Sequence, residues 1–280
     1  MSPIKTFHQF LNEDWVDDSL TVQESDPNGV LTKEQHDFLL EAVSGEWKVN
    51  EKGLVDVNGY IDLSGGRSYS QRSAMKKLPV KFGVVTGRFS LSGAYELESL
   101  EGSPYEVGGD FGIVNCRKIT SLEGGPKKVG GDYTCTGCDS LKNLKGAPEV
   151  VPGYFSCSEC KSLTSLEGAP RKVEFYFSCA FCRELQSLKG APEEVGGTFR
   201  MYDCPNLNSI EGLPKKIETN PEAKKTGTQV MASDCPKLPK GISEFLGDRD
   251  LFQQWQDSDL SLEEFLHKKR GTLKGKEFGF

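Results

Sequence analysis

The residues of this 280-residue chain that could do chemistry are first of all its nine cysteines, six of which form Cys-x2-Cys pairs. The pairs are Cys135 and Cys138, Cys157 and Cys160, and Cys179 and Cys182. Two such pairs in succession have the spacing of a structural zinc site. Disulfide bonds are a second possibility, and burial of free cysteines as small apolar side chains is a third.

The cysteines belong to a repeat of 22 residues that runs from 97 to 217 without insertion or deletion. In place of the first cysteine of each pair, other repeats carry Leu63, Leu91, Ile113, Met201 and Ala232. That position therefore accepts any compact apolar residue, and the odd cysteine count favours a reduced, cytosolic protein. We interpret the cysteines as core residues and predict neither a metal site nor a cofactor, with zinc and disulfides as the alternatives.

Groups for acid–base or nucleophilic catalysis are sparse. The only histidines are His8, His36 and His267, which lie in three separate terminal segments. The repeats offer no nucleophile–base pair, and no Gly-x4-Gly-Lys-Ser/Thr phosphate loop occurs. The sequence therefore predicts a protein that is not an enzyme.

Departures from the repeat gather at six positions that we expect on the outer surface. They are Tyr154, Phe175, Tyr176, Phe181, Arg200 and Tyr202. Phe175 replaces a glycine of other repeats, and Phe181 replaces an asparagine or a glycine. Aromatic residues and arginine are common hot-spot residues of protein interfaces, so we predict that these six bind a partner. The alternative is that some of these rings only pack over neighbouring coils.

The elements that must position these residues are stacked coils. An aromatic residue recurs every 22 residues, at Phe111, Tyr133, Phe155, Phe177 and Phe199. Leucine, proline, valine and cysteine recur with the same step, which is typical of a solenoid whose coils bury their apolar faces against each other. The aromatic-x-Cys segment alternates as a short strand does, with the ring and the first cysteine inward. Degenerate repeats at both ends bring the expected number to about eight coils.

The coil resembles the leucine-rich repeat, whose centre reads Leu-x-Leu-x-x-Asn/Cys. Phe111, Ile113 and Cys116 fit that centre, and the coil has one extra residue on each side of it. Among leucine-rich repeats it is most similar to the short Leu-Pro-rich repeats of bacterial effectors. The resemblance implies a mainly β, right-handed solenoid in which the second cysteine satisfies backbone groups of a loop.

Segments of different composition flank the coils. We assign 14–30 to an acidic linker, 31–57 to an N-terminal cap, 58–240 to the solenoid and 241–280 to a helical C-terminal cap and tail. Thr32 and Gln35 predict a capping box at the start of a helix, and the alternation of 46–57 predicts a hairpin or a pair of edge strands. Ser261 and Glu264 predict a further capping box near the C-terminus.

Residues 1–13 have the spacing of a short amphipathic helix. They also resemble the capsid-targeting peptides on internal head proteins of T-even-like bacteriophages. The matching residues are Lys5, Thr6, Phe7, Phe10, Leu11 and Glu13. The resemblance implies that a prohead protease cleaves between Glu13 and Asp14, and that the protein is packaged in the virion head and delivered to the host bacterial cytoplasm.

The net charge of −7 and the pI of about 5.2 argue against a general attraction to nucleic acid. No apolar run approaches the roughly 18 residues that would span a membrane. We therefore hypothesise a non-enzymatic module that binds and inhibits a host defence or regulatory protein. The alternatives are a protein that sequesters a small molecule or nucleotide, and a structural component of the virion.

Overall fold

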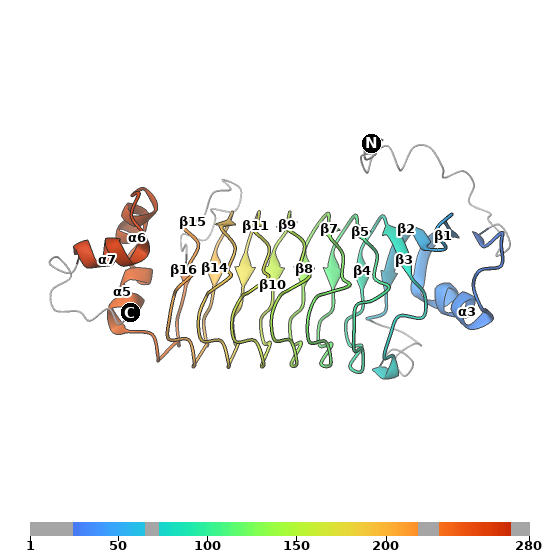
Figure 1. Cartoon of the computed structure of the whole chain (residues 1–280), viewed down its shortest axis with the longest axis horizontal. Coiled ribbons are helices and arrows are strands. Elements are labelled where there is room, and N and C mark those ends of the chain that lie inside the picture. The colour runs from blue at the N-terminus through green and yellow to red at the C-terminus, as the bar shows by residue number, and fades with distance from the viewer. Residues whose placement is uncertain (1–24, 65–72, 218–229, 270–280) are drawn as a thin grey trace.

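The computed structural model of the chain describes residues 25–64, 73–217 and 230–269. Short parallel strands are stacked along one long axis and form a mainly β solenoid (Figure 1). Helix α3 (Lys33–Ala42) lies at one end, and α5 (Lys240–Gly247), α6 (Arg249–Gln256) and α7 (Leu262–Lys269) lie at the other. The period of 22 residues seen in the sequence is therefore the length of one turn of a parallel β-solenoid.

The first described elements form a helix and a hairpin. The Thr32 hydroxyl accepts a hydrogen bond from the Gln35 backbone, and the Gln35 side-chain oxygen accepts one from the Thr32 backbone, so the predicted capping box is confirmed. Strand β1 (Val43–Val49) pairs antiparallel with β2 (Val55–Asp62), as the alternating pattern predicted. Ile61 and Asp62, at the C-terminal end of β2, pair with Phe89 and Ser90 of the next strand of the solenoid. The hairpin therefore covers an edge of the solenoid that would otherwise be unpaired.

Each turn of the solenoid contributes one strand to each of two rows. The first row consists of β4 (Phe89–Ser90), β6 (Phe111–Gly112), β8 (Tyr133–Thr134), β10 (Phe155–Ser156), β12 (Phe177–Ser178) and β14 (Phe199–Arg200). The second row consists of β5 (Glu106–Val107), β7 (Lys128–Val129), β9 (Val150–Val151), β11 (Lys172–Val173), β13 (Glu194–Val195) and β15 (Lys216–Ile217). Neighbours within a row are parallel and in register at the 22-residue step, except that β7 and β9 of the second row are not paired.

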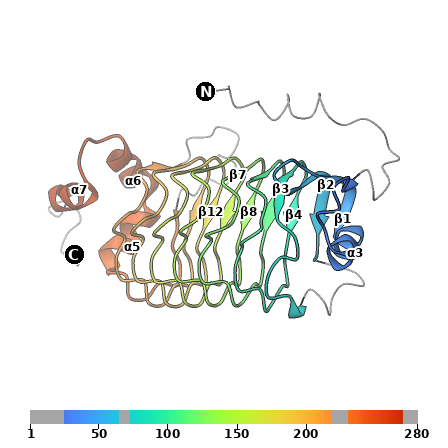
Figure 2. The ribbon, with the colours of Figure 1, turned by 45° about the vertical axis from the view of Figure 1, so that its right-hand side comes forward.

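These rows make about six complete turns, fewer than the eight coils that the sequence predicted. The two remaining coils are present only as incomplete rungs. At the first, β2 and β3 (Phe82–Val85) supply strands to the two rows, but an intervening segment lies outside the described residues. At the last, β16 (Val230–Met231) pairs with β14, and the chain then enters α5. Figure 2 shows the turns side by side between the two helical ends.

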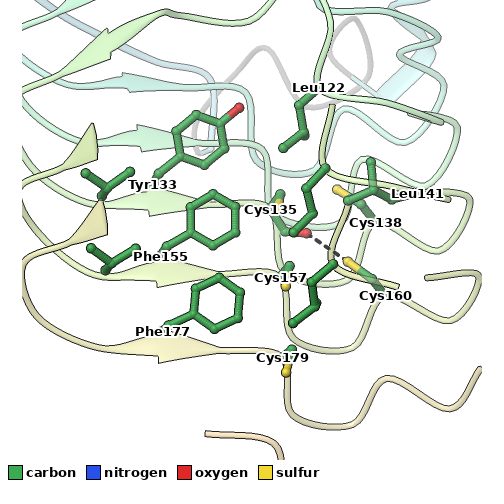
Figure 3. Close-up of a cluster of buried hydrophobic side chains, with 14 of the residues drawn as sticks. Leu122, Tyr133, Cys135, Cys138, Leu141, Phe155, Cys157, Cys160, Phe177 and Cys179 are labelled. Atoms are coloured by element: carbon green, nitrogen blue, oxygen red, sulfur yellow. Dashed lines mark hydrogen bonds between the residues drawn. The ribbon is translucent and has the colours of Figure 1, made fainter. Parts of the chain in front are cut away.

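The core is a set of columns that run along the solenoid axis. The inward aromatic rings stack at centroid separations of 5.3 Å between Tyr133 and Phe155 and 5.4 Å between Phe155 and Phe177 (Figure 3). All of these rings are fully buried. Burial of one such side chain contributes about 1.5–3 kcal/mol, so the column is a main source of stability.

Glycine fixes one corner of every turn. Gly146 and Gly168 have φ angles of 102° and 88°, a region that residues with a Cβ rarely adopt. A Cβ at either position would collide with the backbone of the preceding turn. The 22-residue step is therefore enforced by backbone contact as well as by apolar packing.

The helices after β16 pack their apolar faces together against the last turn. The Phe252 ring lies 5.4 Å from Trp255, and Phe245 lies 6.3 Å from Phe265, all four being buried. Asp248 accepts a hydrogen bond from the Leu251 backbone at the start of α6. The carboxylate of Glu264 accepts a hydrogen bond from the Ser261 backbone, which confirms the second predicted capping box.

Candidate interaction surface

The cysteine side chains lie inside the solenoid. All nine thiols are free and buried, and Cys135, Cys157 and Cys179 follow the aromatic column (Figure 3). The second cysteine of each pair donates its S–H to a backbone carbonyl of the preceding turn: Cys160 donates to Cys135 at 3.3 Å and Cys182 donates to Cys157 at 3.2 Å. The prediction that these are core residues is confirmed. The second cysteine position also supplies a donor to the loop backbone.

Burial raises the pKa of the Cys138, Cys157 and Cys179 thiols, because a thiolate would lose its hydration in the core. Cys138 and Cys157 have pKa values well above the usual range for this reason. Thiolates are the nucleophilic and metal-binding form of cysteine, so this column is poorly suited to either role. Among the described residues, no cluster of three or more His, Cys, Asp or Glu side chains could hold a metal ion.

The outward side of the first row differs between the early and the late turns. In the early turns, Asp110 accepts a hydrogen bond from the Asp132 backbone at 2.8 Å, and Asp132 accepts one from the Tyr154 backbone at 2.9 Å. The residues beside these carboxylates, Gly131 and Gly153, have no room for a Cβ, which would collide with the aspartate. The aspartates and glycines of these turns therefore serve the backbone of the solenoid.

This arrangement ends at Tyr154, where a tyrosine replaces the aspartate. The next turn then carries Phe175 at the position of the glycines, since no aspartate oxygen occupies the space. The Tyr154 side chain is 45% exposed. A hydrogen bond with the Asp132 carboxylate raises the pKa of the Tyr154 phenol, and burial of the carboxylate together with the nearby charge of Asp110 raises the pKa of Asp132.

Tyr176 and Arg200 form a stacked pair on adjacent strands. The guanidinium carbon of Arg200 lies 4.6 Å from the centre of the Tyr176 ring. Gly197 makes this possible, because a Cβ there would lie 3.0 Å from two atoms of the ring. The Nε atom of Arg200 is buried without a hydrogen-bond partner, and no carboxylate within the described ranges forms an ion pair with it. The pair therefore presents a cation that the described part of the solenoid leaves without an ion-pair partner.

Phe181 and Tyr202 form a second aromatic pair at the neighbouring corner. Their ring centroids are 5.2 Å apart in an edge-to-face arrangement, and the Phe181 side chain is 41% exposed. Phe181 has a φ angle of 59°, in the left-handed region. The same corner is occupied in other turns by Gly93, Asn115, Gly137, Glu159 and Asp203. A bulky residue in this region is strained, and such strain often marks a functional position.

The structure thus brings four of the six predicted residues into two contacting pairs, Tyr176 with Arg200 and Phe181 with Tyr202. Tyr154 and Phe175 belong to neighbouring positions of the same turns and make no ring contact with either pair among the described residues. We call Tyr154, Phe175, Tyr176, Phe181, Arg200 and Tyr202 the aromatic surface. Met231, which the sequence comparison missed, pairs in register with Arg200 and is 39% exposed. The segment 218–229 lengthens the last coil, and this obscured the alignment of its outward position with the earlier turns.

The predicted cleavage site between Glu13 and Asp14 lies outside the described residues. The helices that the structure does describe include none long and apolar enough to cross a membrane. The fold and the surface together define a mainly β parallel solenoid whose late turns carry exposed Tyr154 and Phe181 beside the half-buried Tyr176, Arg200 and Tyr202. Comparison with protein-family models, with curated proteins and with solved structures finds no match.

Proposed function

We propose that this chain is a non-enzymatic protein-binding module and that the aromatic surface is its contact with a partner protein. The observation that carries the proposal is the presence of two unusual features on neighbouring turns: a strained, exposed Phe181 ring, and an Arg200 cation stacked on Tyr176. The aspartates of the earlier turns stabilise the coil by accepting backbone hydrogen bonds, whereas neither of these two features does so. Tyrosine and arginine dominate the energetics of protein interfaces when they are desolvated by a partner.

The geometry of the two pairs suits an interface because the rings are held in place before binding. Arg200 is stacked on Tyr176, and Tyr202 is packed against Phe181, so little side-chain freedom remains to be lost on association. Ordering a mobile side chain at an interface costs about 0.5–1.5 kcal/mol. Attachment to short strands adds a rigid support, which favours a defined and specific partner.

The proposal extends to the biological setting through the N-terminal residues. Because 1–13 resemble a phage capsid-targeting peptide, we propose a phage-encoded internal head protein that inhibits a host defence or regulatory protein after delivery. Mass spectrometry of purified virions tests the packaging step. A species that begins at Asp14 is expected, whereas virions that lack this species contradict delivery with the DNA.

Affinity capture from the presumed bacterial host tests the binding surface. The double variant Tyr176→Ala, Arg200→Ala should lose the captured partner while the solenoid stays folded. The matched control is Tyr95→Ala, Arg117→Ala, because Arg117 stacks on Tyr95 at 5.3 Å outside the aromatic surface. Equal capture by the wild type and both variants would remove the aromatic surface from the interaction.

A second candidate function is binding of a nucleotide, favoured by a hollow of about 290 Å³ beside Phe181. Lys161 and Arg183 line this hollow together with the ring, and they offer stacking and positive charge to one ligand. Glu159 and Asp203 also line it and oppose a phosphate, so protein binding is the better-supported function. Thermal unfolding with ATP should show a rise in Tm under this alternative and no change under the main proposal.

A further inference from the structure

The second row of strands is interrupted at one place, between β7 and β9. The strands β9 to β15 form a sheet separate from the one that contains β7. Elsewhere in the row, the residue after the inward valine donates its N–H to the preceding turn. Gly130 donates to Val107 at 2.8 Å and Gly196 donates to Val173 at 2.8 Å. Pro152 occupies this position in β9's turn and has no N–H to donate, so the Val129 carbonyl lacks its usual donor.

The row of ion pairs on the same side stops at the same turn. Lys128 contacts Glu106 at 3.4 Å, and Lys172 contacts Glu194 at 3.2 Å. Between them the outward position is Val150, which is exposed although every other strand of this row carries a charged residue there. Val150 and Pro152 are both exposed at this break, and Tyr154 follows them on the same turn, after the bend at Pro152 and Gly153.

A groove of about 770 Å³ opens at the break. Its walls include Val150, Pro152, Ala147 and Tyr105, whose side chain is 59% exposed. Lys127 also lines the groove; its ammonium donates to the Gly146 carbonyl at 3.1 Å, and no described carboxylate forms an ion pair with it. Glu106 and Glu149 also line the groove, but Glu106 pairs with Lys128 at 3.4 Å and Glu149 pairs with Arg171 at 3.2 Å. The groove therefore offers an apolar floor, a backbone acceptor and, at Lys127, a positive charge that no described carboxylate matches.

We propose that this groove binds an extended acidic segment of the partner protein. The inference rests on the proposed function and assigns the class of ligand. A backbone N–H of the segment donates to the Val129 carbonyl, and an apolar side chain packs on Val150 and Tyr105. Acidic residues on either side of that apolar residue pair with Lys127 at the groove and with Arg200 at the far end of the aromatic surface. Recognition of an extended chain by backbone hydrogen bonds and alternate side chains is a common mode of peptide binding.

The test uses a variant that restores the repeat. Pro152→Gly returns the donor found at Gly130, and Val150→Glu places a carboxylate between Lys128 and Lys172. Both changes agree with the rest of the row, so the variant should fold, which circular dichroism and urea unfolding check. The probe is a displayed library of random 12-residue peptides. The wild type should enrich peptides with an apolar residue flanked by aspartate or glutamate.

Titration calorimetry then compares the binding of one enriched peptide to four proteins: the wild type, the repaired variant, Lys127→Glu and a control variant. The repaired variant, and separately Lys127→Glu, should bind about tenfold or more weakly, which corresponds to loss of one or two good contacts. The control Tyr95→Ala, Arg117→Ala should bind as the wild type does. Absence of acidic peptides from the selection, or equal affinity of the repaired variant, overturns the groove proposal. If the groove proposal fails but Tyr176→Ala, Arg200→Ala still loses the captured partner, the proposed function remains supported. The groove proposal and the proposed function can therefore fail independently.

Discussion

The turns before and after Tyr154 differ in what their outward residues do for the solenoid. Asp110 and Asp132 accept hydrogen bonds from the backbone of the following turn, and the glycines beside them leave room for the carboxylates. Tyr176, Phe181 and Arg200 make no such contribution to the next turn, and Phe181 adds backbone strain. The same 22-residue frame thus carries one stretch that supports itself and one stretch whose exposed groups are best explained by a partner.

The residues that keep the repeat regular and the residues that we assign to binding therefore occupy different columns of the same repeat. The inward columns accept only apolar residues of matching size, since each side chain is packed between equivalent side chains above and below. Outward positions are constrained only where they serve the backbone. Changes in the two kinds of column should therefore have effects of very different size on folding, and the predictions below test this.

The largest effect is expected in the aromatic column. Phe155→Ala should lower the free energy of unfolding by about 3–5 kcal/mol, because the ring is fully buried between Tyr133 and Phe177. Tyr154→Ala, one residue away but outward, should change it by no more than about 0.5 kcal/mol. Urea unfolding followed by circular dichroism measures both. Similar losses in the two variants would mean that the outward ring also supports the fold.

A smaller loss is expected at the glycine corner. Gly168→Ala should cost about 1–3 kcal/mol, because φ is 88° and the new Cβ would collide with the Lys145 backbone. Gly247→Ala is the control, since no atom lies within 4 Å of its added Cβ. Equal stability of the Gly168 variant and the wild type, again by urea unfolding, would show that the turns can separate freely.

Restoring the repeat at the second aromatic pair should have almost no effect on stability. In Phe181→Asn, Tyr202→Ser, relief of a left-handed phenylalanine gains about 1–2 kcal/mol. Loss of the edge-to-face ring pair costs about 0.5–1.5 kcal/mol, which offsets it. The midpoint of urea unfolding should therefore stay close to that of the wild type. A large loss of stability would mean that the Phe181–Tyr202 pair stabilises the fold and is not kept for binding a partner.

The smallest effect concerns Asp132. Its pKa is raised in the folded state by burial of the carboxylate and by Asp110, so its contribution to stability is fully present below its unfolded pKa and is lost as the pH rises through the folded value. Asp132→Asn keeps an oxygen for the Tyr154 backbone and removes the charge. The variant should have a slightly higher Tm than the wild type at pH 7, and this gap should shrink below about pH 4. A difference in Tm that widens at low pH would mean that folding lowers the pKa of Asp132 and does not raise it.

Much of the scaffold could be predicted from the sequence because burial imposes the same requirement at every turn. The cysteine columns are an example: substitution by leucine, isoleucine or methionine in other turns marked them as core positions. The number of complete turns could not be predicted as well. The degenerate repeat after Ile217 keeps the apolar residues of a coil but supplies a described strand only to the first row, and part of the first coil lies outside the described residues.

The sequence showed which residues of the candidate surface depart from the repeat, but it could not show their backbone conformation or their contacts. The sequence identified Phe181 as an unusual residue at a turn, whereas its left-handed backbone and its contact with Tyr202 depend on how adjacent turns align. Stacking of Arg200 on Tyr176 likewise depends on the space over Gly197. The break at Pro152 depends on a hydrogen bond between turns, which a single repeat does not reveal.

The central claim is that the aromatic surface binds a partner and is dispensable for folding. Quantitative affinity capture with Tyr176→Ala, Arg200→Ala, alongside Tyr95→Ala, Arg117→Ala and the wild type, tests it most directly when the unfolding midpoints are measured on the same samples. The account predicts unchanged midpoints in all three proteins and loss of the captured partner only in the first variant. Undiminished capture by that variant, or loss that accompanies unfolding, would contradict it.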